Sequence, residues 1–371
     1  MKRSAPRSAA LVERSRERVR RFALAAAHLF LVGSAAAPPG VAYAQADGAV
    51  RGLYHFVHST ADAERSFAFY HDVLGIELTR SPFAGPPSPD APPPRIVPRA
   101  AAGSDPLVWD LTDTKGARFR TVFMHAANTS FGLELSEFFD IARSERPANP
   151  WDPGASMIEF AVRDLDAVLA AAKGRGAPVV TAGSAPIRVP DGRAVLLRDP
   201  DGYLIRLVQA SPTAIAAAAP GEIVGTAIGI TVASTAASLA FYRGLLRLDV
   251  HESRRADESE LRSYGLPYGT DGGTLTETSV VIPGAQTALT LLEFSMPNGV
   301  APPEPFRWKL QDVGSPQLQL EVRDLDALIA RTRAAGYRFL SVGGRPIQRP
   351  FGRFVFAIGP DAELVEYVEP E

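Results

Sequence analysis

Cysteine is missing altogether from this chain of 371 residues. Its absence excludes disulfides, thiolate metal sites, cysteine nucleophiles and a lipid anchor attached through cysteine. An excess of one charge sign is missing too, because the formal net charge is −2 and the basic residues after the first stretch are scattered. The sequence therefore gives no electrostatic reason to expect a nucleic-acid partner.

The first 44 residues have the composition of a secretory signal peptide. Arginines crowd residues 1–21, an apolar run covers Phe22–Ala37, and Ala42-Tyr43-Ala44 offers a small-residue cleavage site before Gln45. The apolar run is short for a membrane span. We expect export to the periplasm or the extracellular space, with no membrane attachment after cleavage. An uncleaved anchor and a misassigned start codon are the alternatives.

The rest of the chain is organised around the stretch 53–78. Leu53–Val57 is typical of a strand, and Ser59, Thr60 or Asp62 can cap a helix start. Aromatic and aliphatic residues then recur at helical spacing until Gly75, a residue that accepts the left-handed conformation of a helix end. A second strand is expected to follow at Ile76–Leu78.

Parts of this pattern recur along the chain. Ala240-Phe241-Tyr242 repeats Ala68-Phe69-Tyr70, and the six residues 322–327 are identical to residues 162–167. Self-similarity of this kind indicates duplicated architecture. We therefore expect four βαβββ modules, two in each half. The domain boundaries are 50–210 for modules 1 and 2, 211–220 for an alanine-rich linker, and 221–371 for modules 3 and 4.

The order of strand, helix with Phe69-Tyr70, Leu74-Gly75 and strand resembles the opening module of the vicinal oxygen chelate superfamily. This superfamily includes glyoxalase I, bleomycin-resistance proteins and extradiol dioxygenases. The resemblance implies an α+β fold of two glyoxalase-like domains, with curved mixed half-barrel sheets and flanking helices. It also implies a monomer whose domains are related like the subunits of a dimer, and a small molecule as the partner.

The resemblance also places candidate metal ligands. In the family, one ligand comes from the first strand of a module, seven residues before the residue that opens its helix, and another from the last strand. The corresponding residues, in module order, are His55 and Glu134, Met157 and Arg206, Ala227 and Thr290, and Gln317 and Glu366. If module 1 pairs with module 4, as in single-chain four-module glyoxalases, His55, Glu134, Gln317 and Glu366 form one complete site.

That set of nitrogen and oxygen ligands suits Zn, Ni, Co, Mn or Fe as a divalent ion. The site formed by the other pair, modules 2 and 3, would hold no metal. If neighbouring modules pair instead, each half holds too few ligands. A structural reading also stays open, in which each buried glutamate meets an arginine and His55 is an ordinary core histidine.

By resemblance, the chain is a metal-dependent lyase or isomerase that acts on a small substrate with vicinal oxygens. Glu366 would be the mobile base and Glu134 the second carboxylate. Glutathione is not expected as a partner, because Ser59 and Phe138 stand where the family has arginine and asparagine.

Two alternatives belong to other functional classes. One is a metal-free binding or sequestering protein of the bleomycin-resistance type, with a cavity lined by aromatic residues such as Phe119, Phe138, Trp109 and Trp308. The other, an extradiol dioxygenase, is less favoured. Its two histidines and one carboxylate would fall on Ala227, Gln317 and Glu366.

Overall fold

The computed structural model describes residues 48–81, 92–127, 129–190, 192–266, 272–296 and 305–371. The predicted signal peptide lies outside the described residues. Within them, each of the four expected modules opens with a strand and a helix; three strands follow in modules 1 and 2, and four, counting short ones, in modules 3 and 4. The opening helix is capped by the Asp62 side chain, which accepts from the Arg65 N–H, and it ends at Gly75 with a left-handed φ of 66°. Both caps agree with the sequence prediction.

The modules are built from the following elements. Module 1 contains β1 (Val50–Ser59), α2 (Ala63–Leu74), β2 (Glu77–Leu78), α3 (Pro106–Thr112), β3 (Arg118–His125) and β4 (Gly132–Phe139). Module 2 contains β5 (Ser156–Val162), α4 (Leu165–Gly174), β6 (Ile187–Val189), β7 (Gly192–Arg198) and β8 (Leu204–Gln209), and α5 (Pro212–Ala217) follows in the linker.

The second half repeats this order. Module 3 contains β9 (Ile223–Val232), α6 (Thr235–Leu239), β10 (Asp249–Val250), β11 (Arg254–Arg255), α7 (Glu258–Ser263), β12 (Thr274–Val281) and β13 (Ala288–Ser295). Module 4 contains β14 (Pro316–Val322), α8 (Leu325–Ala334), β15 (Arg338–Phe339), β16 (Ile347–Arg349), β17 (Gly352–Ile358) and β18 (Leu364–Pro370).

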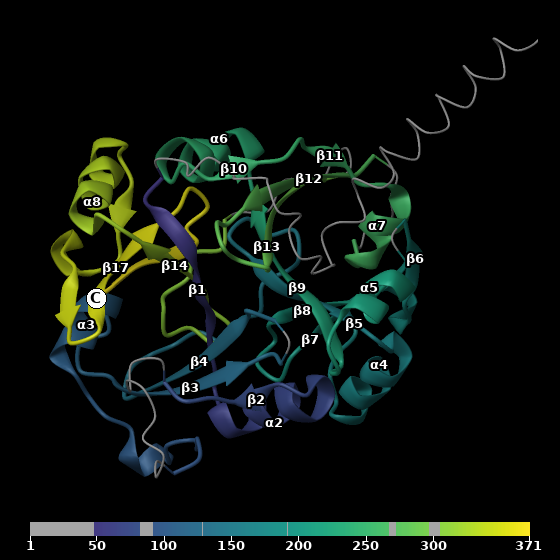
Figure 1. The fold of residues 1–371 in the computed structure, drawn as a ribbon, viewed down its shortest axis with the longest axis horizontal. Coiled ribbons are helices and arrows are strands. Elements are labelled where there is room, and N and C mark those ends of the chain that lie inside the picture. Colours follow the sequence, from purple (N-terminus) through teal and green to yellow (C-terminus); the bar gives the residue numbers. More distant parts are fainter. Residues whose placement is uncertain (1–47, 82–91, 128, 191, 267–271, 297–304) are drawn as a thin grey trace, which may run out of the picture.

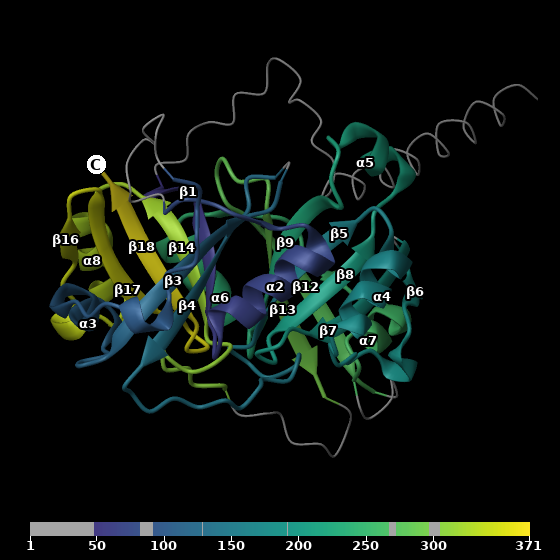
Figure 2. The ribbon, with the colours of Figure 1, turned by 90° about the horizontal axis from the view of Figure 1, so that it is seen from below.

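Modules from opposite halves of the chain pair with each other. In the described residues the strands form two nine-stranded sheets, the first in the order β15-β17-β18-β14-β1-β4-β3-β2 with β16 on β17. The second runs β10-β12-β13-β9-β5-β8-β7-β6, with β11 on β12. Figures 1 and 2 show the two sheets side by side. Module 1 therefore pairs with module 4 and module 2 with module 3, which confirms the α+β prediction of curved, open sheets.

Each sheet has one face under helices, and the opposite face of the first sheet carries the candidate ligands. The helix faces of both sheets share one apolar core, to which α2 contributes Phe69 and Tyr70 and α8 contributes Leu328. The opposite face of the first sheet, here called the site face, is packed by a separate cluster that includes Phe138, Trp308 and Phe356. The short helix α3 adds Leu111 to this cluster and so covers part of the site face.

Within each half of the chain, a buried carboxylate joins the two sheets at the segment that carries the Phe-Tyr motif. Tyr70 donates to Asp199 at 3.0 Å, and its repeat Tyr242 donates to Glu363 at 3.2 Å. Glu363 takes the place of an aspartate because the residue equivalent to Asp199 is Gly359, whose absent Cβ would lie 2.1 Å from Oε1 of Glu363. Both tyrosines thus keep a buried acceptor, as buried hydroxyl groups require.

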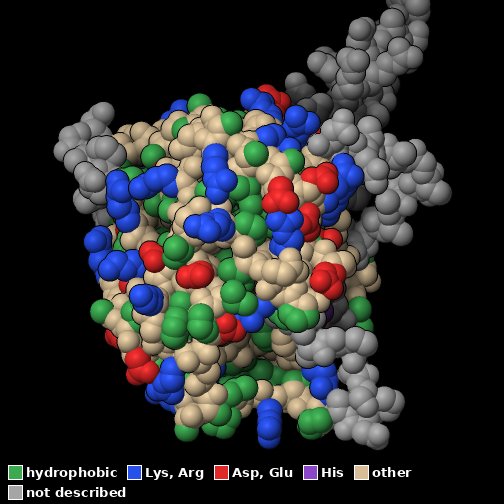
Figure 3. Space-filling model, turned by 90° about the vertical axis from the view of Figure 1, so that its left-hand side faces the viewer, with side chains coloured by type: hydrophobic (Ala, Val, Ile, Leu, Met, Phe, Trp, Pro, Cys, Tyr) green, Lys and Arg blue, Asp and Glu red, His purple; other side chains and the backbone are tan. Residues whose placement is uncertain are grey.

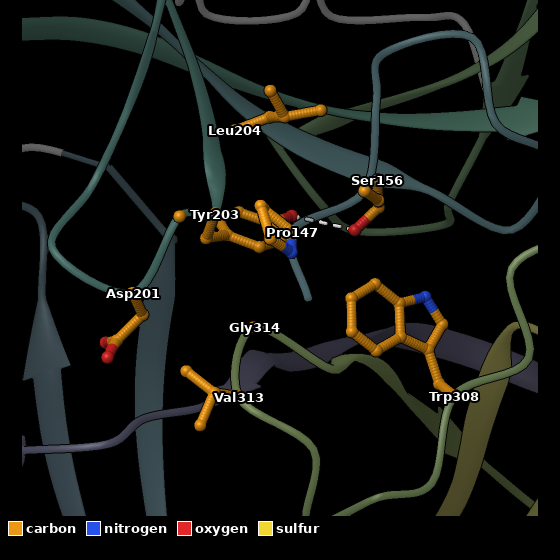
Figure 4. Close-up of a pocket in the computed structure, with 10 residues that line it drawn as sticks. Pro147, Ser156, Asp201, Tyr203, Leu204, Trp308, Val313 and Gly314 are labelled. Atoms are coloured by element: carbon orange, nitrogen blue, oxygen red, sulfur yellow. Dashed lines mark hydrogen bonds between the residues drawn. The ribbon is translucent and has the colours of Figure 1, made fainter. Parts of the chain in front are cut away.

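The junction between the halves is closely packed. Pro147, Tyr203 and Trp308 line a cavity there of about 10 Å³ (Figure 4). That is roughly the room one water molecule needs. The junction is therefore too tight for a substrate, and the site face remains the place to look for chemistry.

Candidate metal centre

Two rows of side chains cross the middle of the first sheet on its site face. In one row, Glu134 of β4 lies beside Val57 of β1, which is opposite Gln317 of β14. In the next row, His55 of β1 is opposite Gln319 of β14, which lies beside Glu366 of β18. Paired residues in neighbouring strands point to the same face, and so do residues two apart along a strand. The four predicted ligands therefore share one face of one sheet.

Contact among them runs through a residue that the sequence prediction missed, Gln319. Its Nε2 donates to Oε2 of Glu366 at 2.7 Å, and its side chain is near enough to Glu134 to lower the pKa of that carboxyl. Glu134 and Glu366 are 8% and 3% exposed and interact electrostatically. Two buried carboxyl groups from opposite halves of the chain thus flank one amide.

Gln317 and His55 are the other two predicted ligands on this face. Gln317 Nε2 donates to Ser59 Oγ at 3.4 Å, on the neighbouring strand. The imidazole of His55 leans over Gly132, since a Cβ atom at Gly132 would lie 2.3 Å from Cδ2 of the ring. Among the described residues, no hydrogen bond or ion pair joins His55 to either glutamate, so the structure brings the two carboxyl groups together and leaves His55 beside them on the same face.

We expect Gly132→Ala to damage the site through His55. The added methyl group has to displace the ring, at a cost of roughly 1–3 kcal/mol for overpacking. Metal affinity should fall about 10- to 100-fold, as when the support of a ligand is disturbed. Titration calorimetry with Zn²⁺ measures it. Gly103→Ala is the matched control, because nothing lies within 4 Å of a Cβ atom there. Equal affinity in both variants would contradict a role for His55.

The charges of these groups are set by burial. Burial raises the pKa of Glu134 to about 7. Burial and the neighbouring charge of Glu134 raise the pKa of Glu366 well above the usual carboxyl range. Burial, with the nearby charge of His125, lowers the pKa of His55 to about 4, so its imidazole is neutral at neutral pH. A neutral imidazole is the form that ligates metals.

The donor set fits a divalent ion. Nδ1 of His55, Oε2 of Glu134 and Oε1 of Gln319 are buried and have no hydrogen-bond partner in the described part of the chain. Buried polar atoms are otherwise nearly always paired. A cation between the two carboxyl groups would favour their charged forms and provide a partner for these atoms. Nitrogen and oxygen donors without sulfur suit the ions expected from the sequence.

The equivalent place on the second sheet holds a fixed cation instead. The residues that repeat His55, Glu134, Gln317 and Glu366 are, in that order, Ala227, Thr290, Met157 and Arg206. Arg206 pairs with Glu159 and lies over the ring of Tyr264, 5.1 Å from its centroid. A guanidinium stays protonated in proteins. The second sheet therefore has an internal ion pair where the first sheet has candidate metal ligands.

Another group with metal-binding chemistry lies on the helix side, where His58, Asp199 and Asp201 place ligand atoms within 4.8 Å of one another. His58 faces away from His55, as its opposite strand parity predicts, and stacks on Tyr203 at 4.8 Å. Oδ1 of Asp199 accepts from the N–H groups of Asp201 and Tyr203, and Oδ2 accepts from Tyr70.

The carboxylate of Asp201 also accepts several hydrogen bonds. Its Oδ1 accepts from the Ala61 N–H and from Arg65, and its Oδ2 accepts from Thr60 at 2.7 Å. Carboxylate oxygens with this many donors have little capacity left for a metal. The contacts instead join the β7–β8 turn of module 2 to the start of α2 in module 1, and we assign the triad to that junction.

The other residues singled out in the sequence lie around the site face. Phe119 and Phe138 pack with ring centroids 6.2 Å apart, and Trp308 donates through Nε1 to the Gly154 carbonyl at 3.0 Å. Trp109, on α3, donates to the Ala117 carbonyl at 2.6 Å. Ser59 donates to the Leu310 carbonyl at 2.6 Å, so its hydroxyl is engaged within the protein.

Charged side chains of one sign do not gather into a patch on the face that carries α3, α8 and β17. Figure 3 shows basic, acidic and apolar side chains interspersed there. No helix in the described part of the chain is long and apolar enough to cross a membrane. These observations leave the buried polar cluster of the site face as the strongest candidate for function.

Comparisons with known proteins agree with the fold. Glyoxalase I from Zea mays is 18% identical, with 86% of this chain and 92% of that chain covered and a TM-score of 0.52. A variant of the same maize enzyme is also 18% identical, and the match covers 86% of this chain and 94% of the variant's chain, with a TM-score of 0.54. At such identity the likeness shows the fold alone. A search of curated proteins gave no match.

The family comparison covers most of the described chain. Residues 52–207 and 225–360 match the family described as the glyoxalase/bleomycin resistance protein/dioxygenase superfamily. Together with the four modules and their cross-half pairing, this match shows that the chain belongs to the glyoxalase/bleomycin resistance protein/dioxygenase superfamily.

Proposed function

We propose that the chain is a metal-dependent enzyme of the glyoxalase type, a lyase or isomerase that moves a proton on a small substrate with vicinal oxygens. The observation that carries the proposal is the pair Glu134 and Glu366, buried on one face with Gln319 between them. His55, Glu134, Gln317 and Glu366 would hold the ion. Bound there, it would act as a Lewis acid that polarises a substrate carbonyl.

The chain's own residues supply the rest of the chemistry. Glu366 would take a proton from the carbon next to the carbonyl and return it to the neighbouring carbon, since a buried carboxyl with a raised pKa suits general acid–base work. The Gln319 amide, 2.7 Å from Glu366, orients that carboxyl. Apolar side chains around the cluster, including Phe138 and Phe356, exclude water from it.

A substrate without glutathione fits this site better than a glutathione conjugate. The position that would need an arginine is Ser59, whose hydroxyl is bound to the Leu310 carbonyl. The other, Phe138, is 4% exposed and belongs to the apolar cluster. Neither side chain offers the charge or amide that recognises a peptide carboxylate.

We further propose that the protein is exported and that the mature chain starts near Gln45. The support is the arginine-rich start, the apolar run and the Ala42-Tyr43-Ala44 site. Both β1, which begins at Val50, and the family match, which begins at residue 52, lie after this cleavage site.

A metal-free binding protein is the second candidate, and the aromatic lining of the site face favours it. Phe119, Phe138, Phe356 and Trp308 contribute to that lining. Aromatic walls with a few polar groups are typical of small-molecule pockets. The buried carboxyl pair is what separates the two candidates, because a binding pocket for an apolar ligand gains nothing from burying two acids.

Proton transfer can be tested before the substrate is identified. We expect the Zn²⁺- or Co²⁺-loaded protein to exchange the carbon-bound hydrogens of hydroxyacetone or dihydroxyacetone for deuterium in D₂O, followed by proton NMR. Protein treated with a chelator should exchange at the rate of buffer alone, and metal added back should restore the rate. Equal rates for the loaded and stripped protein would contradict the proposal and favour the binding protein.

A further inference from the structure

Between equivalent pairing positions, β1 of module 1 has one residue more than β9, its repeat in module 3. Gly52 pairs with Glu321 and His55 with Gln319, so three steps on β1 match two on β14. In the second sheet, Gly225 pairs with Ala161 and Ala227 with Glu159, two steps against two. The additional residue is Tyr54, and it forms a β-bulge immediately before His55. The same bulge is absent from the sheet that holds Arg206.

The bulge places two successive side chains on the same face. Leu53 and Phe56, on either side, pack into the core shared by the helix faces. Tyr54 packs against the cluster of the site face, and its ring meets that of His55 edge-on, with centroids 4.9 Å apart. An ordinary strand would alternate and send Tyr54 to the helices. Bulges often re-aim a side chain next to an active site.

The phenol of Tyr54 lies within electrostatic range of both carboxyl groups of the candidate metal centre, Glu134 and Glu366. The residue is half-buried. The two glutamates can only accept hydrogen bonds when ionised, and the amides of Gln317 and Gln319 already donate to protein atoms. The hydroxyl of a tyrosine can donate a hydrogen bond, which an ionised carboxylate cannot.

We propose that Tyr54 is a substrate-contacting residue of this site, whose hydroxyl donates a hydrogen bond to one of the two vicinal oxygens of the substrate. This inference rests on the proposed function and narrows it. The substrate class is a small hydroxycarbonyl or dicarbonyl with one oxygen directed toward the phenol. The donor would stabilise the negative charge that grows on that oxygen when the neighbouring carbon loses its proton.

The competing explanation is that the ring alone matters, as packing for His55. Tyr54→Phe separates the two, because phenylalanine keeps the ring and removes only the hydroxyl. Tyr264→Phe is the matched control. Tyr264 sits in the equivalent region of the second sheet, against Arg206, and shares no contact with the candidate metal centre.

The test measures three properties of each Co²⁺-loaded protein: metal content, melting temperature and the affinity for acetohydroxamate, a small ligand with two vicinal oxygens. We expect Tyr54→Phe to keep its metal and its melting temperature and to bind acetohydroxamate roughly ten-fold more weakly, the effect of one lost hydrogen bond to a charged group. Tyr264→Phe should bind like the unmodified protein.

Other results overturn the inference in distinguishable ways. Unchanged acetohydroxamate affinity in Tyr54→Phe would refute the role of the hydroxyl and leave the metal centre standing. Parallel loss of metal and ligand in that variant would assign Tyr54 to the support of His55. If the unmodified protein binds neither Co²⁺ nor acetohydroxamate, the proposed function fails, and the assignment of Tyr54 fails with it.

Discussion

Glu366→Gln is expected to slow deuterium exchange into hydroxyacetone by roughly 10²- to 10⁴-fold, the usual contribution of a general acid–base group. In the unmodified protein, Gln319 Nε2 donates to Oε2 of Glu366 at 2.7 Å. Glutamine keeps the shape of the side chain and an oxygen that can still accept this hydrogen bond. It cannot take a proton from carbon. Because three ligands remain, the variant should lose far more activity than metal.

Proton NMR in D₂O and metal analysis by mass spectrometry measure the two losses on the same preparation. Glu363→Gln is the matched control. It removes another fully buried carboxyl group near the start of β18, but that group accepts from Tyr242 on the helix side. The control should exchange at the full rate. Equal losses of metal and of activity in Glu366→Gln would show that Glu366 acts only as a ligand.

Arg206→Met is expected to destabilise the protein by about 3–5 kcal/mol while leaving its metal content unchanged. The side chain of Arg206 is only 11% exposed, and its guanidinium pairs with Glu159 and faces the charge of Glu277. Methionine leaves Glu159 without its cation, whereas Glu277 keeps its ion pair with Arg254. The partly buried charge of Glu159 then costs free energy that the ion pair had offset.

Denaturant unfolding of metal-loaded protein measures this loss. Arg193→Met is the control, since its pair with Asp166 is exposed and screened by solvent, and its loss should change the stability little. Adding Glu159→Met to Arg206→Met should recover much of the stability, because no unpaired acid remains at Glu159. A loss of metal in Arg206→Met would contradict the assignment of the ion to the first sheet.

The sequence was sufficient to predict the modules because their signals are local. Asp62 and Gly75 stand at the ends of the first helix, and the Phe-Tyr motif and residues 322–327 recur at fixed distances. Local signals cannot decide which modules pair, however, because pairing depends on contacts between distant segments. The match of ligand types to modules 1 and 4 was the available clue, and the sheet order confirms that pairing.

Identical sequence also gave different local structure at the two repeats of 162–167. Asp164 caps its helix, accepting from the Ala167 N–H, and its own N–H donates to the Glu222 carboxylate. Asp324, its counterpart, has a left-handed φ of 53° and makes no side-chain cap. The residue equivalent to Glu222 is Ala49, which offers no carboxylate. The difference therefore comes from a segment far away in the sequence.

Two residues of the site went unrecognised for different reasons. Gln319 could have been found, because Gln317 and Gln319 alternate with leucines and must therefore share a face. Tyr54 could not, because simple alternation sends it to the opposite face, and only the pairing register reveals the bulge. The helix α3, which covers part of the site face, follows a proline-rich stretch that reads as an irregular loop.

The most direct test of the central claim is the metal-to-chain ratio of purified protein, loaded with Zn²⁺ or Co²⁺, desalted and analysed by mass spectrometry. One ion per chain is expected in the unmodified protein. The ratio should fall close to zero when Glu134→Gln and Glu366→Gln are combined, and it should stay at one in Asp199→Asn, which alters the triad at the junction of modules 1 and 2. A ratio near zero in the unmodified protein, or a ratio that survives the double substitution and is lost in Asp199→Asn, would contradict a single metal centre on the first sheet.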